Sequence, residues 1–259
     1  MPLTAIIRPV SRSIDRCELT HLSREPIDYA AAVRQHADYE AALQRCGCDI
    51  VRIPAAHDMP DAVFVEDVAI VLDELAVMTR PGAVSRRNES PQVEAALARL
   101  RDVARIVEPG TLDGGDVLRV GKTFFVGRTT RSSDEGIEQL RARVSEFGYD
   151  VRAVDIRGCL HLKSAVTAVG EATLLGNSAC VDRREFGDVD WIEVDAREPS
   201  AANALRIGNQ VIYPRAFVHT VDLLRRHLEA HNITLDLVDA SELAKAEGGV
   251  TCCSLILRT

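Results

Sequence analysis

The chain has 259 residues, of which 46% are hydrophobic and 27% charged, a composition typical of a globular protein with a sizeable core. The formal net charge of −8 argues against nucleic acid or an anionic membrane as a partner and favours a small cationic molecule. Only 4% of the residues are aromatic, so we expect no platform for stacking bases.

The N-terminal residues contain no basic segment followed by a long apolar stretch, and we therefore expect no signal peptide. No run of about 18 apolar residues predicts a membrane span. The seven cysteines follow no disulfide-framework spacing. We expect reduced thiols and a cytoplasmic location.

The first predicted elements are a strand at residues 3–7, a helix at 28–46 and a strand at 49–53. We expect the helix to end at Gly47, because glycine readily takes the left-handed conformation of a helix terminus. The apolar residues of the helix recur with helical spacing and form one face, consisting of Tyr29, Ala32, Val33, Tyr39 and Leu43.

The rest of the chain repeats a hairpin with a short turn, a helix and a further strand. The hairpins are predicted at residues 68–79, 117–127, 164–175 and 204–214. The helices are predicted at 90–100, 133–148, 178–186 and 219–231, with the weakest helical pattern at 178–186. The following strands are predicted at 104–107, 150–154, 190–194 and 234–238. A period of about 40 to 55 residues indicates a repeat architecture.

A last strand, predicted at residues 250–257, can pair with the strand at 3–7 and complete a fifth hairpin. Five such units would close into a propeller-like ring, which makes residues 1–259 a single domain. Cys252 and Cys253 would be neighbours in this last strand, so we expect their side chains to point to opposite faces.

The segment before each hairpin should lie near the central axis of such a ring. These five segments hold most of the chemically suggestive residues, namely Glu66-Asp67, Asp113-Gly114-Gly115-Asp116, His161, Asn203 and Cys252. A cysteine, a histidine and an acid are the minimal set for covalent catalysis by a thiol. The alternative is that polar residues gather at loop-to-strand junctions in any fold.

Six segments of the chain resemble the dimethylarginine dimethylaminohydrolase family of the guanidine-modifying, or pentein, superfamily. In chain order they read DAVFVED (61–67), TRPGA (79–83), SRR (85–87), TLDGGDV (111–117), HLKS (161–164) and TCCS (251–254). The resemblance implies an α/β fold, a five-bladed α/β propeller with a central active-site channel. It also implies hydrolysis of N-omega-methylated arginines to citrulline and a methylated amine.

The resemblance implies Cys252 as the nucleophile, His161 as the general acid and base, and Asp113 as the carboxylate that orients His161. It implies a substrate site, with main chain contributed at the first and last positions, formed by Leu19, Asp61, Glu66, Asp67, Arg86, Arg131 and Ala246. The two arginines would hold the substrate carboxylate, a group that arginine recognises in a bidentate manner. Asp116 is expected to support the glycine turn or the site.

The implied chemistry suits these residue types. A guanidinium carbon is a poor electrophile, and a thiolate attacks it more readily than water does. A nearby guanidinium or a protonated His161 would favour the thiolate of Cys252. His161 would protonate the departing amine and then deprotonate the water that releases citrulline. This hydrolysis needs no metal or organic cofactor.

Glu66 and Asp67 interrupt the apolar run from residue 62 to residue 72. Burying two adjacent carboxylates without partners would cost several kcal/mol each. Their charge can be balanced by a cationic substrate or by an internal arginine, for which Arg8 and Arg80 are the candidates. Both arrangements can hold, with one carboxylate each.

Other interpretations remain open at this point. An arginine deiminase, an agmatine deiminase or an amidinotransferase would use the same cysteine and histidine. Arginine deiminases usually carry an extra helical insertion for which this chain has no room, and agmatine has no carboxylate for Arg86 and Arg131. A non-catalytic propeller that binds ribosomes is a more distant alternative. Zinc could bind Cys252, His161 and the carboxylates adventitiously and inhibit, and the oligomeric state, monomer or homodimer, is open.

Overall fold

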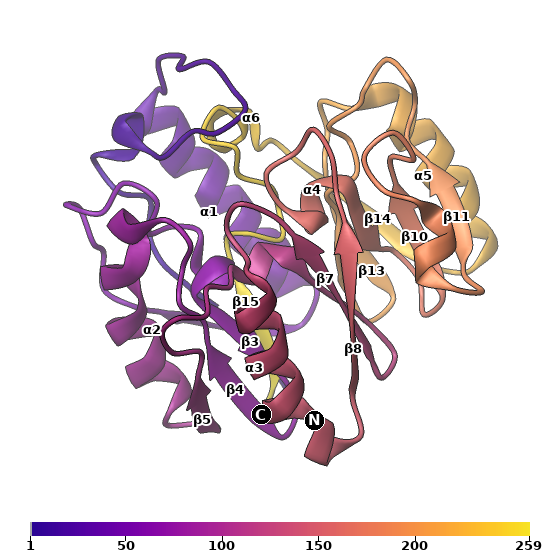
Figure 1. Ribbon diagram of the computed structural model, residues 1–259. Helices are drawn as coiled ribbons and strands as arrows, with labels where there is room; N and C mark the ends of the chain where they lie inside the picture. Colours follow the sequence, from indigo (N-terminus) through magenta and orange to yellow (C-terminus); the bar gives the residue numbers. More distant parts are fainter. Residues whose placement is uncertain (1) are drawn as a thin grey trace.

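The computed structural model describes residues 2–259, which form five three-stranded sheets, here called blades 1 to 5 (Figure 1). Blade 1 consists of β15 (Leu255–Arg258), β1 (Leu3–Ile7) and β2 (Cys48–Arg52). Blade 2 consists of β3 (Ala69–Val71), β4 (Leu75–Met78) and β5 (Asp102–Arg105). Blade 3 consists of β6 (Val117–Val120), β7 (Thr123–Arg128) and β8 (Asp150–Asp155). Blade 4 consists of β9 (Val166–Ala168), β10 (Thr173–Gly176) and β11 (Asp190–Glu193). Blade 5 consists of β12 (Leu205–Ile207), β13 (Gln210–Pro214) and β14 (Thr234–Val238).

All five blades share one topology, an antiparallel pair of strands followed by a parallel third strand. This is the repeat predicted from the sequence, and the five-bladed α/β propeller is confirmed. Blade 1 closes the ring because β1 pairs with β15, with Leu3 opposite Arg258. The two ends of the chain therefore lie side by side (Figure 1).

The longer helices are α1 (Tyr29–Arg45), α2 (Ser90–Leu97), α3 (Asp134–Val144) and α5 (Val218–Ala230). Two of them begin at capping residues that the sequence marks: Asp28 accepts the N–H of Ala31 at 3.0 Å, and Ser133 accepts that of Gly136 at 3.2 Å. Two single-turn helices, α4 (Leu162–Ala165) and α6 (Ser241–Ala244), complete the set. The predicted helix at 178–186 is wrong, because this part of blade 4 forms only a 3-10 turn at Arg183–Phe186.

The buried face of α1 differs in part from the predicted one. Tyr29 and Val33 are 37% and 41% exposed, whereas His36 and Ala42 are buried beside Tyr39. The hydroxyl of Tyr39 donates to the carbonyl of Val250, which leads into the last strand. Ala32, Tyr39 and Leu43 of the predicted face are buried, and the observed face keeps the helical spacing.

The predicted strand at 250–257 is correct only from Leu255 onward, because residues 250–253 form a turn. The side chain of Asn203 accepts the N–H of Thr251 at 3.1 Å and replaces a strand partner there. The strand from which the alternation of Cys252 and Cys253 was expected is therefore absent here: Sγ of Cys252 accepts the N–H of Gly249, and Sγ of Cys253 contacts its carbonyl. That the two side chains point to opposite faces stays a prediction. In blade 4, Ser164 likewise belongs to α4 instead of the hairpin.

The apolar core is divided into five clusters, each of which fills the space between two neighbouring blades. Leu118 of blade 3, for example, packs with Val166 and Leu174 of blade 4. Polar and apolar residues both face the axis of the ring, where Glu66, Lys163 and Leu118 line one cavity. No helix in the described part of the chain combines the length and the apolar character that crossing a membrane requires.

Two cavities lie near the axis. The larger, of about 560 Å³, lies among the inner strands of the blades and is lined at one point by Glu66 and Lys163. The smaller, of about 20 Å³, is lined by Cys252 and His161. The chemistry predicted from the sequence therefore belongs to the smaller cavity.

Candidate active site

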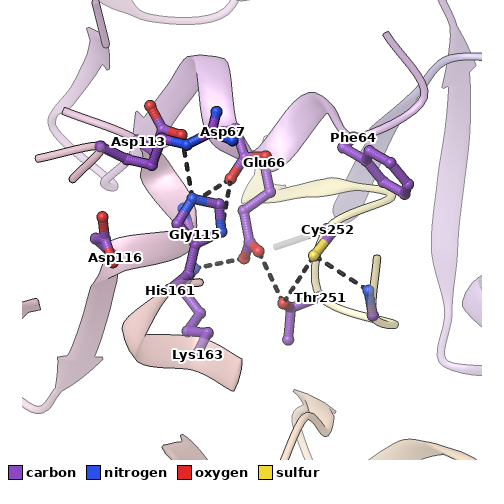
Figure 2. A network of polar contacts seen from close by, with 12 residues as sticks. Phe64, Glu66, Asp67, Asp113, Gly115, Asp116, His161, Lys163, Thr251 and Cys252 are labelled. Carbon is purple, nitrogen blue, oxygen red and sulfur yellow. Dashed lines mark hydrogen bonds and ion pairs between the residues drawn. The ribbon is translucent and has the colours of Figure 1, made fainter. Parts of the chain in front are cut away.

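Cys252 lies in the turn that precedes β15, and its side chain is 9% exposed (Figure 2). Its Sγ accepts the N–H of Gly249 at 3.3 Å and lies 3.9 Å from Oγ1 of Thr251. Burial, followed by the nearby carboxylates of Glu66 and Asp67, raises the pKa of the Cys252 thiol to about 12. The resting side chain is therefore a neutral thiol, and a positive charge beside it would favour the thiolate.

His161 precedes α4, and its imidazole lies between two carboxylates (Figure 2). Its Nε2 is 3.1 Å from Oδ2 of Asp113, and its Nδ1 is 3.8 Å from Oδ1 of Asp67. Burial lowers the pKa of His161, but Asp67, Asp116 and Asp113 outweigh it and raise the pKa to about 9. The side chain is therefore protonated at neutral pH and can act as an acid.

Asp113 is fully buried and uses both of its oxygens. Oδ2 contacts His161, and Oδ1 accepts the N–H of Gly82 at 2.9 Å. A carboxylate held in this way fixes the orientation of the imidazole. The structure thus brings together the predicted base and its predicted orienting acid.

Asp116 is also fully buried and supports the same region without contacting Cys252. Its carboxylate accepts hydrogen bonds from the N–H of Leu162 and from the hydroxyls of Thr129 and Ser132, at 3.0, 2.7 and 2.6 Å. Burial raises the pKa of Asp116 to about 6, against the opposing effect of His161. The residue holds the start of α4, and hence His161, against blade 3.

Asp67 forms a buried ion pair with Arg86, with 2.6 Å between Oδ2 and Nη1. Arg86 also donates to Glu89, with Nη2 2.9 Å from Oε2, and to the carbonyl of Phe64. The internal arginine that balances this acid is therefore Arg86, and the candidates Arg8 and Arg80 are wrong. Arg86 lines the small cavity, and its contact with a substrate carboxylate stays a prediction.

Glu66 points away from its neighbour Asp67 (Figure 2). Its Oε1 lies 2.5 Å from Nζ of Lys163, and its Oε2 accepts the hydroxyl of Thr251 at 2.7 Å. The side chain lines the larger cavity, and the smaller cavity is lined by Asp67 instead. The two adjacent carboxylates therefore line different cavities, Glu66 the larger and Asp67 the smaller. A direct contact of Glu66 with substrate stays a prediction.

The remaining predicted substrate residues fall into two groups. Asp61, Arg131 and Ala246 line the small cavity, as expected. Leu19 does not line it and packs, partly buried, against the core cluster between blades 1 and 5. Its neighbour Glu18 lines the cavity, and the N–H of Glu18 donates to Oδ2 of Asp61 at 3.1 Å.

Residues 18–22 form a segment, here called the cover loop, that is held over the small cavity. The carboxylate of Glu247 accepts the N–H groups of Thr20, His21 and Leu22, the latter two at 2.6 and 2.7 Å. Arg131 donates to Oγ1 of Thr20 at 3.0 Å. A cavity of about 20 Å³ holds roughly one water molecule, so an arginine-sized molecule would fit only after the lining, to which Glu18 of the loop belongs, had moved.

Asp67, Asp113 and His161 form the one group in residues 2–259 whose ligand atoms lie close enough to share a metal ion. Arg86 already balances Asp67, and a protonated His161 cannot bind a metal. Cys252 is not part of this group. Inhibition by zinc through Cys252 therefore stays a prediction.

Sequence reasoning missed the roles of Lys163 and Glu89. Lys163 is two residues after His161 in a segment already singled out, and Glu89 is three residues after Arg86 in a 3-10 helix. The spacing of three residues between Arg86 and Glu89 was a signal for their pairing, because side chains three apart lie on one helical face. The pairing of Lys163 with Glu66 joins residues 97 positions apart and has no local signal.

A five-bladed α/β propeller with a buried cysteine, a protonated histidine and carboxylates at its axis defines an enzyme of the guanidine-modifying class. No model of a known protein family matches the chain. The chain is 39% identical over 255 residues to the N(G),N(G)-dimethylarginine dimethylaminohydrolase of Streptomyces coelicolor, covering 98% of this chain and 96% of that protein. The chain belongs to the dimethylarginine dimethylaminohydrolase family.

Solved structures agree with this assignment. A cysteine-to-serine variant of the Pseudomonas aeruginosa enzyme, complexed with citrulline, has a TM-score of 0.91 and 34% identity, covering 99% of this chain and 100% of that chain. A histidine-to-glycine variant of a dimethylarginine dimethylaminohydrolase, an adduct with S-methyl-L-thiocitrulline, has a TM-score of 0.90 with the same identity and coverage.

Proposed function

We propose that the protein hydrolyses asymmetric dimethylarginine and monomethylarginine to citrulline, with release of dimethylamine or methylamine. The observation that carries the proposal is one cavity lined by a neutral thiol at Cys252, a protonated His161 and the carboxylates of Asp61 and Asp67. The relatives named above support it, since one contains citrulline and another is a thiocitrulline adduct.

The substrate brings a positive charge next to Cys252, where burial and the carboxylates of Glu66 and Asp67 disfavour the thiolate. A guanidinium held by Asp61 and Asp67 beside Cys252 lowers the thiol pKa, and the thiol proton is released to solvent. Sγ attacks the guanidinium carbon, and the bond from that carbon to the methylated nitrogen breaks. His161 gives its proton to the departing amine, leaving a covalent thiouronium on Cys252.

The neutral His161 then takes a proton from a water molecule that attacks the thiouronium carbon. The carbon–sulfur bond breaks, and the hydroxyl proton of the tetrahedral adduct passes to the departing sulfur, which releases neutral citrulline and returns the Cys252 thiol. Asp113 orients the imidazole in both steps and favours its charged form. In this proposal Arg86 and Arg131 face the substrate carboxylate, and main chain near Leu19 and Ala246 completes the pocket.

The proposal includes one catalytic domain over residues 1–259, because the pairing of β1 with β15 joins the first and last strands in one sheet. It also includes a reducing, cytoplasmic location, which suits seven cysteines that are all unpaired thiols. The partner is a small cationic guanidino amino acid.

The test is release of citrulline and dimethylamine from asymmetric dimethylarginine by wild type and by Cys252→Ser. Arginine and agmatine are assayed in parallel. We expect dimethylarginine turnover that disappears in the variant, and little turnover of the other two. Ammonia release from arginine at a comparable rate, or full activity of Cys252→Ser, would overturn the proposal.

A further inference from the structure

Asn203 connects the two segments that carry the nucleophile and the base. It lies in the segment before the hairpin of its blade, as His161 and Cys252 do in theirs, and the residue is 9% exposed. Its Nδ2 donates to the carbonyl of Lys163 and to Oγ1 of Thr251, both at 3.0 Å, and its Oδ1 accepts the N–H of Thr251 at 3.1 Å. One amide from blade 5 thus joins α4 to the turn of Cys252.

The orientation of this amide is determined by its neighbours. The hydroxyl of Thr251 donates its hydrogen to Oε2 of Glu66, so it accepts from Asn203. The main-chain N–H of Thr251 needs an acceptor, which is Oδ1. The carbonyl of Lys163 lies in a helix of one turn and has no partner within that helix. It therefore accepts the second hydrogen of Nδ2 of Asn203.

Asn203 also packs against the residue that contacts the reacting sulfur. A Cβ added to Gly249 would lie 2.4 Å from Oδ1 of Asn203, so this close approach requires glycine. The N–H of Gly249 donates to Sγ of Cys252. The amide of Asn203 is thereby one contact away from the hydrogen bond that favours the thiolate.

Within residues 2–259 no hydrogen bond joins Cys252 directly to His161, so their separation depends on what holds the two segments. Asn203 is not among the residues lining either axial cavity. We propose that Asn203 is a positioning residue, which sets Cys252 relative to His161 and holds the N–H of Gly249 on the sulfur. The proposal rests on Cys252 and His161 acting as in the proposed function.

The test compares Asn203→Leu with Asn177→Leu. Leucine has the same branched arrangement of side-chain heavy atoms as asparagine, although it is larger, and it makes no hydrogen bonds. Asn177 is a matched control, because it is 7% exposed, donates to the carbonyl of Pro199 and accepts from the N–H of Ala179, both at 2.9 Å, away from the axis. Both variants lose a buried amide, and only one loses the connection between the two segments.

We expect kcat of Asn203→Leu to fall about 10- to 100-fold, with KM within about threefold of wild type, because misplacement of a reacting group costs this much. The rate of Cys252 alkylation by iodoacetamide should fall and its pH profile should move to higher pH. Asn177→Leu should keep the wild-type kcat and the wild-type rate and pH profile of alkylation, and it should lose a similar amount of thermal stability.

Asn203→Leu with kcat and alkylation within twofold of wild type, measured well below its melting temperature, would overturn the proposal. If that variant does not fold, Asn203→Ser decides by the same two readouts, because its smaller side chain leaves room for water. Alkylation needs no substrate, so this arm fails or succeeds independently of the proposed function.

Discussion

The imidazole of His161 and the carboxylate of Asp113 form a buried pair, with 3.1 Å between Nε2 and Oδ2. An anion in contact with an imidazole favours its protonated form. In the proposed function, the pair therefore prepares an acid for the leaving amine before any substrate arrives. It also keeps the second ring nitrogen facing Asp67, 3.8 Å away.

Asp113→Asn tests this relationship. The amide keeps the shape of the side chain and its acceptor for the N–H of Gly82, but it removes the negative charge. We expect kcat to fall about 100-fold or more and the pKa of His161 to fall below about 9. The pKa is measured by NMR titration of the imidazole, and Asp134→Asn on the surface is the control. An unchanged pKa of His161 would contradict the assignment.

The raised pKa of His161 predicts how stability depends on pH. Burial lowers this pKa, but Asp67, Asp116 and Asp113 raise it from 6.5 to about 9 in the folded chain. The folded chain therefore holds the proton more tightly, so its contribution is complete below pH 6.5 and is lost as the pH rises to about 9. We expect this contribution to the free energy of unfolding to fall by about 3 kcal/mol over this pH window.

The measurement is urea unfolding at several pH values across this window, for wild type and His161→Gln. The free energy of unfolding of the variant should change less with pH, because it lacks the titrating ring. Parallel curves for the two proteins would show that His161 does not titrate between these limits.

Lys163→Met should destabilise the protein, because it leaves the carboxylate of Glu66 with Thr251 as its remaining hydrogen-bond donor. The two side chains are 15% and 11% exposed, so the loss should be below the 3 to 5 kcal/mol typical of breaking a fully buried pair, about 2 kcal/mol. Chemical denaturation measures it. The double variant with Glu66→Gln should recover most of the loss, and a purely additive result would count against the pair.

Glu247→Ala should release the cover loop, because this carboxylate accepts three of the loop's main-chain N–H groups. We expect faster limited proteolysis at residues 18–24, identified by mass spectrometry, with an unchanged rate at other sites. Glu242→Ala is the control, since it accepts the N–H of Asp28 in the same region but not those of the loop. Equal protection of the loop in both variants would show that other contacts hold it.

The blades could be predicted because their signals are local. Alternating apolar residues and short turns lie within each hairpin, and the capping residues Asp28 and Ser133 mark helix starts from within the chain. The weak pattern at 178–186 gave only a 3-10 turn, which begins at the capping residue Asp182. The position that Cys252, His161 and Asp113 share in the repeat is also a property of the sequence, and it predicts that they meet near the axis.

The pairing of charges could not be predicted, because it depends on residues far apart in sequence. The choice of Arg86 as the partner of Asp67 follows from how η3 (Val84–Glu89) folds over blade 2. The turn at residues 250–253 likewise depends on Asn203, 48 positions earlier, and overrides a strand-like composition. Periodicity contains no information of this kind.

The division of the apolar core between neighbouring blades has a consequence for cooperativity. Each blade contributes to two of the five clusters, so the loss of one blade would expose both of its interfaces to water. Open arrays of repeats can fray from their end units, but a closed ring has none. The five small sheets should therefore melt in a single transition. A cavity at one interface, such as that left by Phe125→Ala between blades 3 and 4, should lower the melting temperature of the whole molecule.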